Sequence, residues 1–155
     1  MKAYFAEVLA CEAIGLAGVT DGKSLIEWRR CLVEKLMVPH SPYAKAMRQT
    51  TDDSGRSDFL HEWHDLIVAA VGRLRSNAGA VSERSDHVES SPCEAQRTAV
   101  LILAALYGGS VLSQISGDPR HLDAALDLAL RPLMIDAGAG ATPVCATSQI
   151  RHVEP

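Results

Sequence analysis

The feature that most constrains the fold is an uncharged stretch of 20 residues, Thr98–Gly117, inside a helix expected over residues 92–116. Its apolar side chains occupy every face of that helix: Val100, Leu101, Ile102, Leu103, Leu106, Val111, Leu112 and Ile115. A helix of this kind in a soluble protein has to be covered on all sides. The stretch is long enough to cross a membrane, but Tyr107, Gln114 and several serines interrupt it, and a basic flank is missing. We therefore expect a cytoplasmic protein with no membrane span.

Helix boundaries elsewhere are indicated by apolar spacing, caps and prolines. Expected helices cover residues 3–17, 24–38, 42–49, 58–75, 92–116 and 119–131, and residues 76–90 read as a polar surface loop. Ser24 with Glu27, and Ser91 with Glu94, have the spacing of capping boxes, while prolines occupy the first positions of the helices over 42–49 and 92–116. Strand alternation is absent. The pattern predicts an all-α domain of about six helices over residues 1–135 and a flexible tail over 136–155.

Composition and charge exclude several functional classes. The chain has 155 residues, enough for one domain with its own core, and a formal net charge of −4, which gives no global attraction to nucleic acid. The four cysteines, Cys11, Cys31, Cys93 and Cys145, are scattered and form no C-x-x-C pair. We interpret them as reduced core thiols or incidental residues, and we expect neither a metal nor a cofactor.

Candidate binding residues come mainly from aromatic side chains. Trp28, Phe59, Trp63 and Tyr107 lie on or near the apolar stripes of three helices, and together with the polar tip of His64 they could line a cavity for an apolar ligand. The plainer interpretation is that they fill the core. His61 and His64 are three residues apart, which is not the H-E-x-x-H spacing of zinc proteases. We expect no catalytic residue, although a small helical enzyme that uses His61, His64 or a buried acid is the lesser alternative.

A glycine pair, Gly108-Gly109, interrupts the apolar helix. Each glycine costs about 1 kcal/mol relative to alanine in a helix interior, so the pair indicates a bend or the close approach of another backbone. Only about five other helices are available to cover this one, which favours a two-fold symmetric dimer. The expected interface residues are Ala105, Gly108, Gly109, Leu112, Leu122, Ala125 and Leu126.

The run from Ala99 to Gly109, continued by Val111-Leu112, Asp118-Pro119 and Leu122 to Leu126, resembles the last two helices of TetR-family transcriptional regulators. The resemblance implies a regulatory domain whose final two helices form a four-helix dimer interface and whose earlier helices enclose a small-molecule pocket. In that family, ligand binding changes the separation of two N-terminal helix-turn-helix heads.

The sequence departs from this family at the N-terminus, where we expect no complete DNA-binding head. Only 16 residues precede Ala17–Gly22, the one segment that resembles the turn of such a head. The expected function is thus a TetR-like core that forms a homodimer, binds an apolar effector and meets DNA only if a head is supplied. The alternative is an interaction module that heterodimerises with a full-length regulator.

Overall fold

The computed structural model describes residues 2–48, 54–81 and 92–138, and over these ranges it contains six α-helices and no strand. The helices are α1 (Ala3–Ala17), α2 (Gly22–Met37), α3 (Pro42–Arg48), α4 (Ser54–Val81), α5 (Pro92–Ser116) and α6 (Arg120–Gly138). The predicted all-α class is confirmed.

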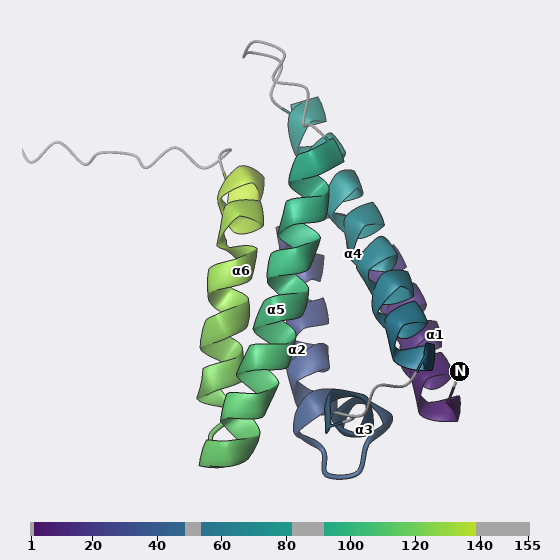
Figure 1. Cartoon of the computed structure of the whole chain (residues 1–155). Helices are drawn as coiled ribbons and strands as arrows, with labels where there is room; N and C mark the ends of the chain where they lie inside the picture. Colours follow the sequence, from purple (N-terminus) through teal and green to yellow (C-terminus); the bar gives the residue numbers. More distant parts are fainter. Residues whose placement is uncertain (1, 49–53, 82–91, 139–155) are drawn as a thin grey trace, which may run out of the picture.

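Helix α5 occupies the middle of the molecule. It runs antiparallel to α6 on one side and packs against α4 on the other, while α1 lies along α4 and α2 lies behind α5 and contacts α6 (Figure 1). The short α3 closes one end and touches α1, α2 and α5. The core is built around packed aromatic rings: Phe59 stacks on Phe5 at 4.4 Å and lies tilted against Trp63 at 5.3 Å between ring centroids. These three side chains are fully buried.

The start of α2 differs from the prediction. Its N-cap is Asp21 rather than Ser24: the Ser24 amide donates to Asp21 Oδ1 at 2.8 Å, and the Asp21 amide donates to Ser24 Oγ at 3.0 Å. Ser24 therefore closes the capping box from the third helical position. Glu27, the expected partner of Ser24, pairs instead with Arg30. The other expected cap, Ser91, lies outside the described residues.

Helix α4 is longer than predicted, because its polar C-terminal part is held by contacts that periodicity does not reveal. It starts at Ser54 and continues to Val81, through a segment expected to be a loop. Within that segment Ser76 Oγ donates to the Gly72 carbonyl at 3.0 Å, and Asn77 Nδ2 donates to the Thr20 carbonyl at 2.9 Å. The rest of the expected loop, residues 82–90, lies outside the described residues.

Helix α6 also continues past its predicted end, through Pro132 to Gly138. A proline inside a helix removes one hydrogen bond and costs about 3 kcal/mol or more. Leu130 and Leu133 on either side of it are buried in the core, and their burial offsets this cost. The domain boundary predicted at residue 135 thus falls inside α6. Residues 139–155 of the expected tail lie outside the described residues.

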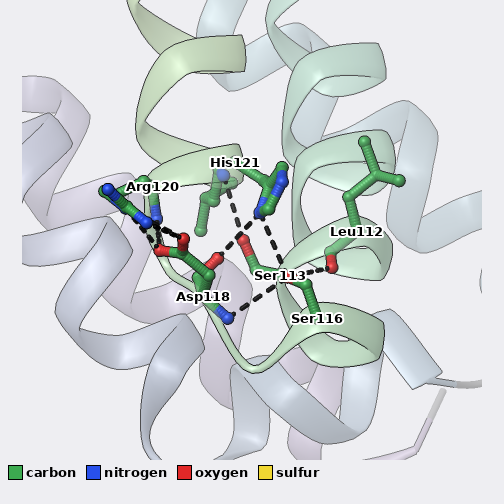
Figure 2. A network of polar contacts seen from close by, with 7 residues as sticks. Leu112, Ser113, Ser116, Asp118, Arg120 and His121 are labelled. Atoms are coloured by element: carbon green, nitrogen blue, oxygen red, sulfur yellow. Dashed lines mark hydrogen bonds and ion pairs between the residues drawn. The ribbon is translucent and has the colours of Figure 1, made fainter.

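The turn between α5 and α6 is fixed by a network of polar contacts (Figure 2). The Leu122 amide donates to Ser113 Oγ at 3.0 Å, which ties the start of α6 to the buried side of α5. The Asp118 carboxylate accepts from the Arg120 side chain and amide, and these hydrogen bonds lower the Asp118 pKa to about 2. Gly117 has a φ of 70°, a left-handed conformation that favours glycine. The two helices therefore turn back on each other almost without a loop.

Candidate functional site

One side of α5 is left uncovered by the rest of the described chain. Its exposed residues recur every three or four positions and include large apolar side chains that are between 47% and 80% exposed. We call this surface the open face of α5, formed by Leu101, Ala104, Gly108, Val111, Leu112 and Ile115. No charged residue occurs between Thr98 and Gly117, so the face is uncharged along this length. The expectation that the helix is covered on all sides is not met within a single chain.

The residues expected at a dimer interface divide between this surface and the subunit interior. Gly108 and Leu112 belong to the open face, and Ala105 and Ala125 are half-buried. The remaining three, Gly109, Leu122 and Leu126, are buried within the chain.

Of the two alternatives for the glycine pair, a bend or a close backbone approach, the structure shows a close approach at Gly109, and the neighbour is α6 of the same chain. A Cβ added at Gly109 would lie 2.9 Å from Leu122 Cα, whereas one at Gly108 would meet nothing within 4 Å. Gly109 and Leu122, both expected at the interface with a second copy, contact each other within the chain, and Leu126 is buried in its core.

The five residues expected to line one ligand cavity lie in different surroundings, although Phe59 and Trp63 contact each other. Phe59 and Trp63 are fully buried in the core. His64 is half-buried, with its Nδ1 3.3 Å from Asp65 Oδ1. Trp28 lines a cleft between α1 and α2, and Tyr107 lines a groove between α4 and α5.

The α1–α2 cleft, with a volume of about 290 Å³, contains a buried carboxylate that was missed from the sequence. Glu12 is 1% exposed, and it accepts hydrogen bonds from Trp28 Nε1 at 3.0 Å and from Tyr43 Oη at 2.5 Å. Burial, followed by the Glu12 charge, raises the Tyr43 pKa. Each carboxylate oxygen thus has a donor from another helix, and Glu12 ties α1 to α2 and α3. Its position in the apolar stripe, four residues after Val8, was the available signal.

The α4–α5 groove is lined by Arg56 and Leu60 of α4 and by Val100, Leu103, Ala104 and Tyr107 of α5. Its volume is about 370 Å³. The Arg56 guanidinium lies 5.3 Å from the centre of the Tyr107 ring. Arg56 Nη1 and Tyr107 Oη are both buried, and neither has a hydrogen-bond partner in the part of the chain that the structure describes. Arg56 was missed because it precedes the helix expected over residues 58–75.

The histidines and cysteines that the structure describes lie at or near the surface. His61 Nδ1 lies 2.8 Å from the Ser57 carbonyl of its own helix. Among the described residues, no group of three or more His, Cys, Asp or Glu side chains could hold a metal ion. Cys11, Cys31 and Cys93 are free thiols, and none of them is buried, so they are not core residues. Cys145 lies outside the described residues.

Comparison with known proteins gives no relative from which a function could be transferred. No protein-family model matches the chain, and neither does any curated protein or solved structure. Within the described ranges, the segment Cys93–Ser116 is long and apolar enough to cross a membrane by length and composition alone, with a mean hydropathy of 1.7. Core helices of soluble proteins meet the same criterion.

Proposed function

We propose that the chain is a TetR-like regulatory core that forms a homodimer through the open face of α5 and binds an apolar small molecule. The observation that carries the proposal is the open face itself, a long apolar surface without charge and with Gly108 near its middle. Uncovered apolar surfaces of this kind mark interaction sites.

A second copy is the occupant that suits this surface best. In a two-fold symmetric interface the same patch meets itself, and Ala104 and Gly108 would let two α5 helices approach closely at the centre. Leu101, Val111, Leu112 and Ile115 are about half to four-fifths exposed. Covering each would contribute roughly 1–2 kcal/mol, or on the order of 8–16 kcal/mol over two copies. That is comparable with the roughly 4–15 kcal/mol that association costs.

Regulation would follow from a shift in population between dimer geometries. A ligand favours whichever geometry binds it more tightly, by its difference in affinity and no more. DNA contact would require a separate head, because the net charge of −4 offers no general attraction to phosphates. We expect no sequence-specific band in a gel-shift assay with the purified chain at physiological salt. An operator-specific band would contradict this part of the proposal.

Sedimentation equilibrium with two glycine variants tests the dimer. Gly108 and Gly79 are both exposed helical glycines with nothing within 4 Å of an added Cβ, but Gly79 lies on α4. We expect the wild type and Gly79→Arg to be dimers and Gly108→Arg to be a monomer, because the new charge would be buried in the apolar interface. A dimeric Gly108→Arg would contradict the assignment of this face. A monomeric wild type would favour the heterodimerising module instead.

A further inference from the structure

The α4–α5 groove differs from the open face of α5 in holding two buried polar atoms without partners. Arg56 Nη1 and Tyr107 Oη come from different helices, and the guanidinium lies 5.3 Å from the Tyr107 ring centre. Buried polar groups in folded proteins are almost always hydrogen-bonded, and leaving one unpaired destabilises the folded state. Two such atoms at one groove point to a ligand that supplies the missing partners.

The chemistry of the two groups defines that partner. A guanidinium is positively charged and only donates hydrogen bonds, so it needs an acceptor and favours an anionic one. Burial raises the Tyr107 pKa against the opposing effect of Arg56, so its hydroxyl stays protonated and available as a second donor. A carboxylate has two acceptor oxygens for two donors.

The rest of the groove is lined by apolar side chains, which indicates that the rest of the ligand is hydrocarbon. Leu60, Val100 and Leu103 offer hydrocarbon surface, and the volume of about 370 Å³ falls within the range of small-molecule pockets. The α1–α2 cleft makes a useful contrast, because Glu12 there already has donors on both oxygens and needs no ligand.

We infer that the α4–α5 groove binds an apolar monocarboxylate, its carboxylate on Arg56 and Tyr107 and its hydrocarbon body along Leu60, Val100 and Leu103. The inference deepens the proposed function by naming a class of effector. Only the regulatory role of this ligand rests on the proposed function. The binding site itself does not, because every lining residue belongs to one chain.

Isothermal titration calorimetry with three probes of equal chain length tests the ligand class on the wild-type chain. Octanoate should bind once per chain, and octan-1-ol should bind at least about tenfold more weakly, since hydrogen bonds to charged groups are the stronger ones. Octylamine should not bind detectably, because its cation would face the guanidinium. Equal affinity for octanoate and octan-1-ol, or no binding of octanoate, would overturn the inference.

Three variants locate the site. Arg56→Gln should weaken octanoate binding at least about tenfold and leave octan-1-ol binding unchanged, and Tyr107→Phe should weaken octanoate by about three- to tenfold. Arg30→Gln is the matched control, because Arg30 lies on the exposed side of α2 and pairs with Glu27 and Glu34. Thermal unfolding of each variant checks that it is folded. Octanoate affinity that is the same in Arg56→Gln and the wild type would refute the assignment.

The dimer and the ligand are tested by separate measurements. Sedimentation of the unliganded chain reports on the open face of α5, and calorimetry per chain reports on the groove. Octanoate binding to a monomeric chain would leave the groove assignment standing while refuting the homodimer. A dimer that binds none of the three probes would refute the groove assignment and leave the homodimer standing.

Discussion

Replacing Gly109 with alanine tests how α5 packs against α6, and the adjacent Gly108 provides the control. Both variants gain about 1 kcal/mol of helix propensity, so this contribution cancels in the comparison. A Cβ at Gly109 would lie 2.9 Å from Leu122 Cα and 3.2 Å from Ala125 Cβ, whereas a Cβ at Gly108 meets open space. The backbone of α6 cannot give way locally, and overpacking of this kind costs about 1–3 kcal/mol. We therefore expect Gly109→Ala to be less stable than Gly108→Ala by about 1–3 kcal/mol.

Urea unfolding followed by circular dichroism measures this difference. Because association would stabilise the folded state by mass action, midpoints should be compared over a range of protein concentrations and extrapolated to the monomer. In that limit Gly108→Ala should be more stable than the wild type. Equal midpoints for the two variants, or a more stable Gly109→Ala, would refute the account of the α5–α6 contact.

Two further predictions concern the buried carboxylate of Glu12 and the half-buried carboxylate of Asp118. Tyr43→Phe removes the hydroxyl that donates to buried Glu12, and we expect urea unfolding to show a loss of about 1.5–3 kcal/mol; an unchanged midpoint would argue against this hydrogen bond. The hydrogen bonds from Arg120 lower the Asp118 pKa from 3.8 to about 2, so their stabilisation is complete above about pH 4 and is lost as pH falls through about 2. Asp118→Asn should therefore lose less stability than the wild type between about pH 5 and pH 2 in acid titrations, and parallel curves would contradict the assignment.

Local chemistry made much of the fold predictable. Pro42 and Pro92 are the first residues of α3 and α5 in the structure, as predicted, because proline lacks the amide hydrogen that a first helical residue leaves unused. The predicted N-cap of α2 was wrong because two overlapping segments, Asp21-x-x-Ser24 and Ser24-x-x-Glu27, both have the spacing of a capping box. Tertiary contacts made by Asn77, as well as the burial of Leu133, lengthened α4 and α6 beyond what periodicity indicates.

The candidate site was less predictable, because its parts come from distant segments. Tyr107 was expected in a ligand site, but nothing in the sequence relates it to Arg56 on another helix. The glycine pair predicted a close backbone approach, which is confirmed at Gly109, yet spacing alone could not distinguish the next helix of the same chain from a helix of a second copy. That distinction depends on which side of α5 faces α6.

Val100 and Ala104 stand on the border between two surfaces of α5. Both line the α4–α5 groove and both are exposed, Ala104 as part of the open face and Val100 next to Leu101 of that face. A molecule held in the groove would therefore touch side chains that a second α5 would also meet. Thermodynamic reciprocity then applies: if a carboxylate strengthens or weakens self-association by some factor, self-association changes the affinity for that carboxylate by the same factor.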